Sequence, residues 1–79
     1  MSRLAVAVLA YIVSYQAQHG YPPTIREIGG RFRMRSTNGP RYYLRALEAE
    51  GYLVRAGGLS RALRITDAGR RALGAGGVA

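Results

Sequence analysis

Residues 21–51 read YPPTIREIGGRFRMRSTNGPRYYLRALEAEG and predict two helices joined by a short turn. Thr24 and Glu27 have the spacing of a capping box, in which the threonine hydroxyl accepts the Glu27 amide and the carboxylate bonds back. The first of these helices is therefore expected to begin at Thr24 and to last about eight residues. Gly29 and Gly30 lie inside it, and they indicate close approach by another helix.

The second of these helices is placed by its proline. Pro40 is tolerated only in the first turn of a helix, so the helix must start between residues 36 and 39. It is expected to run to about Glu50 and to stop at Gly51, because glycine readily adopts the left-handed conformation that ends helices.

The flanking segments supply the remaining elements. Residues 2–19 have helical periodicity and end at Gly20. Two short strands are expected within the hairpin 52–65, and a final short helix at 67–73. The last six residues, 74–79, are small and rich in glycine.

This order of elements predicts a mainly α fold with a small β-hairpin, the winged helix-turn-helix, with three helices, a two-stranded wing and a short C-terminal helix. We expect residues 1–73 to form this single domain and residues 74–79 to be a disordered Gly/Ala tail. Seventy-nine residues are too few for a second core.

The charge balance indicates a polyanionic partner. The chain has twelve cationic residues, all arginine, against four acids, for a formal net charge of +8. Nucleic acid is the first partner to consider, and we expect double-stranded DNA. A membrane is not expected as a partner, because the apolar run 4–13 is too short to span a bilayer and Arg3 is the only cation of the first helix.

The same composition excludes most catalytic chemistry. There is one histidine, and there is no cysteine or lysine. No spacing is typical of metal ligands, and no glycine pattern matches a phosphate loop. We therefore expect no enzyme, no metal and no cofactor, and a cytoplasmic, nucleoid-associated protein, since a chain without cysteine suits a reducing compartment.

The helix at about 37–50 has two contrasting faces. Its apolar face comprises Pro40, Tyr43, Leu44 and Leu47, and the opposite, mainly polar face comprises Asn38, Arg41, Tyr42, Arg45 and Ala49. Arginine matches O6 and N7 of guanine and asparagine matches N6 and N7 of adenine, so the polar face is predicted to read bases in the major groove. Five arginines and no acid lie within residues 28–47, whereas a merely solvated face would mix signs.

Two groups of side chains leave alternatives open. Tyr42 has the chemistry to pack on a thymine methyl, to bond a phosphate or to shield the edge of the core. Arg55, Arg61 and Arg64 decorate the hairpin, where they either contact phosphate or the minor groove or protect the edge of a short strand. The side chains expected at the DNA backbone are Thr24, Arg26, Arg33, Arg35, Thr37, Arg55, Ser60, Arg61 and Arg64.

Several motifs resemble the N-terminal DNA-binding domain of the LexA-type SOS repressors over residues 4–65. They are His19-Gly20-Tyr21-Pro22-Pro23-Thr24 with Glu27-Ile28, Arg35-Ser36-x-Asn38, Leu44-x-Ala46-Leu47-Glu48-x-x-Gly51 and Gly58-x-Ser60-Arg61-Ala62. The segment 66–73 looks instead like the closing helix of other winged-helix regulators, as in the MarR group.

The resemblance implies operator binding by the helix at about 37–50. The residues at positions that the family uses on bases are Ser36, Asn38, Gly39, Arg41 and Tyr42. Three departures matter: Arg33 replaces the usual turn glycine, Pro40 stiffens the start of the reading helix, and Arg41 and Tyr42 replace acidic, small or polar residues. We therefore do not expect this chain to bind the family's operator sequence. The family's self-cleaving Ser–Lys domain is not expected within these residues, because they include no lysine.

We therefore expect a sequence-specific duplex-DNA-binding protein, a transcriptional regulator of the repressor type. One alternative is a nonspecific architectural DNA-binding protein, and another is a winged-helix protein–protein adaptor with an acidic partner. Apolar Val6, Leu9, Val13 and Leu73 exceed what a small core needs, which predicts a homodimer through the first and last helices.

Overall fold

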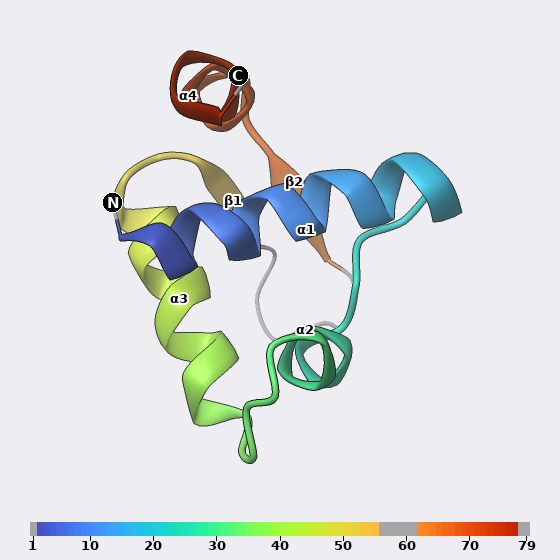
Figure 1. The fold of residues 1–79 in the computed structure, drawn as a ribbon. Helices are drawn as coiled ribbons and strands as arrows, with labels where there is room; N and C mark the ends of the chain where they lie inside the picture. The colour runs from blue at the N-terminus through green and yellow to red at the C-terminus, as the bar shows by residue number, and fades with distance from the viewer. Residues whose placement is uncertain (1, 56–61, 78–79) are drawn as a thin grey trace.

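The computed structural model describes residues 2–55 and 62–77. Its elements are α1 (Arg3–His19), α2 (Ile25–Arg31), α3 (Asn38–Ala49), β1 (Leu53–Arg55), β2 (Leu63–Ile65) and α4 (Asp67–Gly77). Figure 1 shows α2 and α3 meeting at one end of the molecule, with α1 running across the middle and α4 at the far end. The mainly helical chain with one antiparallel hairpin confirms the predicted winged helix-turn-helix.

Both ends of α1 follow from local chemistry. The Ser2 hydroxyl accepts a hydrogen bond from the Ala5 amide at 3.1 Å, which satisfies one of the unpaired amides of the first turn. Gly20 has φ +83° and its amide donates to the Gln16 carbonyl, so the predicted stop is confirmed.

The capping box of α2 forms as predicted and also joins two helices. The Glu27 amide donates to the Thr24 hydroxyl at 3.1 Å, and the Thr24 amide donates to the Glu27 carboxylate at 2.7 Å. The other oxygen of that carboxylate accepts the Tyr15 hydroxyl at 3.0 Å, which ties α1 to the start of α2. Burial, followed by the nearby Glu27 charge, raises the pKa of Tyr11, which lies one turn before Tyr15 on α1.

Two glycines lie where α2 and the following turn meet the start of α3. A Cβ built on Gly29 would lie 3.4 Å from Cγ of Pro40, whose ring is buried. A Cβ on Gly39 would lie 2.8 Å from the Met34 sulfur. The expected close approach is therefore confirmed at Gly29, but it is wrong for Gly30, which is exposed and has open space around it.

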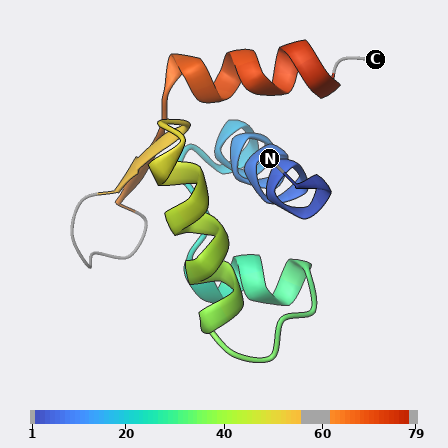
Figure 2. The ribbon, with the colours of Figure 1, turned by 90° about the vertical axis from the view of Figure 1, so that its left-hand side faces the viewer.

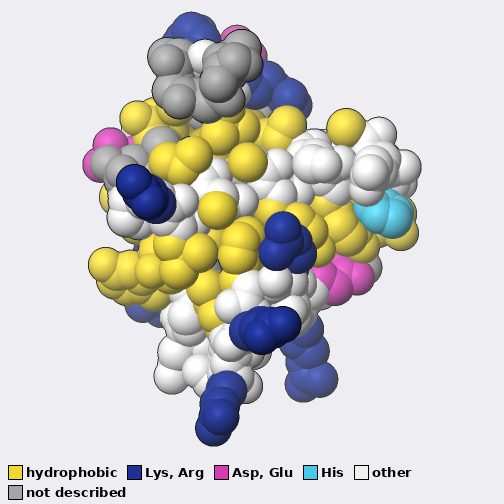
Figure 3. All heavy atoms as spheres, viewed as in Figure 1, with side chains coloured by type: hydrophobic (Ala, Val, Ile, Leu, Met, Phe, Trp, Pro, Cys, Tyr) yellow, Lys and Arg dark blue, Asp and Glu magenta, His cyan; other side chains and the backbone are white. Residues whose placement is uncertain are grey.

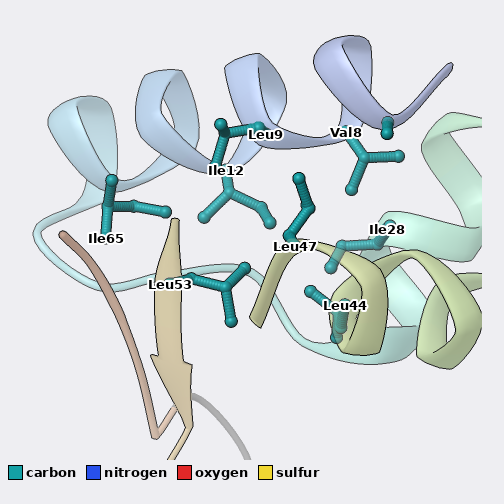
Figure 4. Packing of buried hydrophobic residues seen from close by; sticks show 9 residues of the cluster. Val8, Leu9, Ile12, Ile28, Leu44, Leu47, Leu53 and Ile65 are labelled. Carbon is teal, nitrogen blue, oxygen red and sulfur yellow. The ribbon is translucent and has the colours of Figure 1, made fainter. Parts of the chain in front are cut away.

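The core is one cluster between α1, α2, α3 and the hairpin. The buried residues are Ala5, Val8, Leu9, Ile12, Ile28, Leu44, Leu47, Leu53 and Ile65 (Figure 4). The predicted apolar face of α3 turns inward, with Leu44 and Leu47 buried and Tyr43 half-buried. Leu9 belongs to this cluster, and Val13 and Leu73 pack against it. The apolar surplus from which a homodimer was inferred is thus smaller than expected, because the core absorbs these side chains.

Thr66 joins the hairpin to the start of α4. Leu53 pairs with Ile65 in the antiparallel register, and Thr66 follows directly. The Thr66 amide donates to the Tyr52 carbonyl at 3.1 Å, and its hydroxyl donates to the Gly51 carbonyl at 2.7 Å while accepting the Gly69 amide at 3.0 Å. This bonding fixes where α4 begins.

The end of α4 differs from the prediction. The helix continues to Gly77 instead of stopping at Leu73, so residues 74–77 belong to α4. The early stop was expected because glycine has poor helix propensity, but the helix is already nucleated and capped at Thr66, so its continuation past Leu73 needs no second nucleus. Residues 78 and 79 of the predicted tail, and the predicted turn at Gly57 and Gly58, lie outside the described residues.

Replacing Gly69 by alanine is expected to destabilise the fold, whereas the same change at Gly74 should stabilise it. A Cβ on buried Gly69 would overlap the Tyr52 carbonyl and lie 3.2 Å from Cγ2 of Ile65. Overpacking costs about 1–3 kcal/mol, partly offset by helix propensity, so we expect a net loss of about 1–2 kcal/mol. Gly74 is exposed with open space around it, so Gly74→Ala should gain up to about 1 kcal/mol. Urea unfolding measures both, and shifts of the same sign would contradict this packing.

Candidate nucleic-acid interface

The exposed face of α3 carries the side chains predicted to read bases. Asn38, Arg41, Tyr42 and Arg45 are all exposed, and Pro40, Leu44 and Leu47 are buried on the opposite side. The acids of α3 and its C-cap, Glu48 and Glu50, lie at its C-terminal end. The start of α3 therefore presents arginine and amide donors without a competing carboxylate.

The start of α3 leaves its hydroxyl groups in an unusual arrangement. Thr37 is the N-cap residue, but its side chain makes no capping hydrogen bond. Instead the Ser36 hydroxyl accepts the Asn38 amide at 3.2 Å. Because a hydroxyl that accepts a bond still has its own proton to donate, Ser36 keeps a donor at the tip of the helix. Gly39, which the resemblance also places at the bases, is half-buried and lies next to the Met34 side chain.

A hollow of about 400 Å³ lies between α2 and the turn that leads to α3. It is lined by Ile25, Arg26, Gly29, Gly30, Met34, Arg35, Ser36 and Thr37. Four of the residues predicted at the DNA surface thus share one concave site that combines guanidinium and hydroxyl donors. Figure 3 shows arginine side chains projecting from this end of the molecule, over α2 and the turn. Such a site suits an anionic group such as a phosphate.

Four residues of this hollow were not among the predicted site residues. Ile25, Gly29, Gly30 and Met34 also line it, and none of them carries charge. The sequence feature that points to Gly30 is its position in a helix interior, where an exposed glycine without a packing neighbour costs stability. Because glycine has no side chain, the backbone beside Arg26 stays open.

Arg31 is exposed but contacts aromatic rings. Its guanidinium lies 5.1 Å from the Phe32 ring centroid and 5.9 Å from the Tyr11 ring centroid.

Arg33 occupies the turn in a conformation that glycine prefers. Its φ is +59°, and among the described residues no other non-glycine residue has positive φ. The backbone therefore keeps the left-handed turn, although Arg33 stands where the family usually has glycine. Arg33 is exposed, and it lies two residues before Arg35, which lines the hollow.

The variant Arg33→Gly is expected to stabilise the fold and to weaken DNA binding at once. Relief of left-handed strain, about 1–2 kcal/mol, exceeds the added freedom of glycine in the unfolded chain, about 0.4–1 kcal/mol. The free energy of unfolding should rise by about 0.5–1 kcal/mol, as measured in urea. Arg35→Gly, at a residue without positive φ, is the matched control and should give no gain. A loss of stability in Arg33→Gly would contradict the strain argument.

The wing is described only along its strands. Arg55 is half-buried on β1 opposite Leu63, and Arg64 is exposed on β2 opposite Val54. The predicted backbone contacts Ser60 and Arg61 lie outside the described residues. Thr24 is half-buried and its hydroxyl is engaged in the cap of α2, so its predicted phosphate contact must use the remaining hydroxyl proton.

Two further arginines lie far from this surface. Arg70 and Arg71 are exposed on α4, which packs on α1 at the end of the molecule opposite α2 and the start of α3 (Figures 1 and 2). In the part of the chain that the structure describes, no cluster of His, Asp or Glu is placed to hold a metal ion. Across residues 2–55 and 62–77, no helix is long and apolar enough to cross a membrane.

Comparison with known proteins gives one consistent result. The LexA DNA binding domain family matches residues 2–62. The LexA repressor of Anaeromyxobacter dehalogenans (strain 2CP-C) is 57% identical over 72 residues, which are 91% of this chain and 31% of that protein. The LexA repressor of Sorangium cellulosum is 55% identical over 60 residues (76% and 26%), and that of Myxococcus xanthus is 48% identical over 69 residues (87% and 31%). The chain thus spans about a third or less of the length of these relatives.

Proposed function

Because the chain belongs to the LexA DNA-binding domain family, we propose that it binds specific sequences in duplex DNA and acts as a transcriptional repressor. In this proposal α3 enters the major groove and the hairpin contacts the flanking backbone. The matched relatives are named as repressors, which supports the regulatory role. A location at the nucleoid follows from the same proposal.

The observation that carries the proposal is the exposed face of α3. Asn38, Arg41 and Arg45 project from the side opposite the buried Leu44 and Leu47. A reading helix needs such donors near its start, because that end reaches the base edges. Arg41 has the fork that matches guanine, and Asn38 has the amide that matches adenine. Ser36 adds a hydroxyl donor at the tip of the helix.

Phosphate contacts would set the orientation of α3. The hollow between α2 and the turn that leads to α3 has Arg26, Arg35 and Thr37 around one concave site that suits a backbone phosphate. Arg33 in the turn adds a further cation, and Arg55 and Arg64 are positioned on the wing strands. These contacts give affinity and register without sequence information, so they complement the reading face.

A single domain of this kind buries about 600–1,000 Å² on DNA and binds modestly alone. A homodimer on an inverted repeat would raise the affinity, and we keep the packed pair α1 and α4 as the surface for it. The arginines of α4, Arg70 and Arg71, are far from the reading face and are free to border such an interface.

The test is selection from a random duplex-DNA pool at near-physiological salt, followed by sequencing of the retained molecules. Enrichment of a defined site would support the proposal, and an inverted repeat would support the dimer. Retention without enrichment, falling steeply as salt rises, would identify a nonspecific architectural protein. No retention even at low salt would favour an adaptor that binds an acidic protein partner, and would overturn the proposal.

A further inference from the structure

Tyr42 is the most exposed large apolar side chain among those that the structure describes. It is 65% exposed, although it lies on a helix that buries its opposite face in the core. A tyrosine that shielded the edge of the core would be largely covered, so that role is excluded. An aromatic ring exposed on this helix face is available to contact a ligand.

The ring is held in place by its neighbour. Tyr43 is half-buried and packs against the core. The Tyr42 and Tyr43 ring centroids are 5.0 Å apart with an interplanar angle of 88°, which is the edge-to-face geometry that aromatic pairs favour. Tyr42 is therefore presented on a fixed support, and little side-chain freedom would be lost when a ligand contacts it.

The surroundings of the ring indicate what it contacts. Tyr42 lies one helical turn after Asn38, so the two side chains are neighbours on the exposed face of α3. The preceding residue, Arg41, and Arg45 one turn later are exposed cations able to bind phosphate or guanine. The ring is the one aromatic group of this face. In the major groove, the apolar feature of a base edge is the C5-methyl group of thymine.

We propose that Tyr42 reads the C5-methyl group of a thymine, in the A·T base pair that Asn38 contacts or in the adjoining pair. The inference rests on the proposed function, because it requires α3 to lie in the major groove. It goes further by fixing which base chemistry this position selects. The aromatic face supplies the contact, and the phenolic hydroxyl is not needed for it.

The test uses the duplex enriched by the wild-type protein, with each thymine replaced in turn by deoxyuridine, which lacks only the methyl group. Replacement of one thymine in each half-site should lower the affinity about fourfold, which is the effect expected from losing one buried methyl group. Tyr42→Phe should keep this penalty. Tyr42→Ala should bind more weakly and be indifferent to the replacement. Arg45→Ala is the matched control from the same face, and it should lose affinity but keep the penalty.

Two results would overturn the inference while leaving specific binding intact. Equal losses in Tyr42→Phe and Tyr42→Ala, with no deoxyuridine effect, would show that the hydroxyl bonds a phosphate. A penalty that persists in Tyr42→Ala would show that another group reads the methyl. Absence of any enriched site would be a failure of the proposed function itself and would remove this inference with it. Thermal unfolding of Tyr42→Ala should stay close to wild type because the ring is exposed.

Discussion

Replacing Leu47 by alanine is expected to lower the free energy of unfolding by about 2–5 kcal/mol. Leu47 is fully buried, and it lies in the middle of the cluster formed by α1, α2, α3 and β1 (Figure 4). Its removal leaves a cavity that four elements line, so no single element can move to close it. A domain of this size has a total stability of about 4–12 kcal/mol, so this one change removes a large share of it.

Urea unfolding followed by circular dichroism measures this loss. Leu4→Ala is the matched control, because it is the same substitution at a residue of α1 that is 37% exposed. It should cost less than about 1 kcal/mol. Comparable losses in the two variants would mean that the core is not centred where α3 packs on α1.

Alanine at Arg41 or Asn38 is expected to weaken binding to the selected duplex by about 1–3 kcal/mol each, or roughly 5- to 150-fold. Each variant removes a side chain able to form two parallel bonds to one base. Discrimination should be lost at one base position in each half-site, a guanine for Arg41 and an adenine for Asn38. Fluorescence anisotropy with a panel of singly substituted duplexes measures both affinity and discrimination.

Arg35→Ala provides the comparison. Arg35 lines the hollow beside α2 and is proposed to bind phosphate, so its loss should weaken binding evenly across the panel and reduce the salt slope by about one. If Arg41→Ala also weakened all duplexes evenly, Arg41 would be a phosphate contact and not a base reader.

The features that the sequence predicts well are those set by neighbouring residues. The capping box of Thr24 and Glu27, the stop at Gly20 and the start of α3 near Pro40 depend on contacts within one helical turn. The two faces of α3 follow from helical periodicity alone, and the apolar face is buried as expected.

The features that could not be predicted from the sequence depend on contacts between distant segments. Both Gly29 and Gly30 indicated close approach, but only Gly29 meets Pro40, and which glycine faces α3 depends on how the helices cross. Leu9 is a core residue because α1 packs across three elements. The hollow beside α2 combines one helix with a turn that has no regular pattern. Local sequence rules do not describe these placements.

The measurement that tests the central claim most directly is protection of guanine N7 from methylation by dimethyl sulfate, on the duplex enriched by the protein. Guanine N7 lies in the major groove and adenine N3 in the minor groove. With α3 in the major groove, the wild-type protein should protect guanine N7 at positions within each half-site, and Arg41→Ala should lose protection at one of them. Protection confined to adenine N3, or a pattern unchanged in Arg41→Ala, would contradict reading of the major groove by α3.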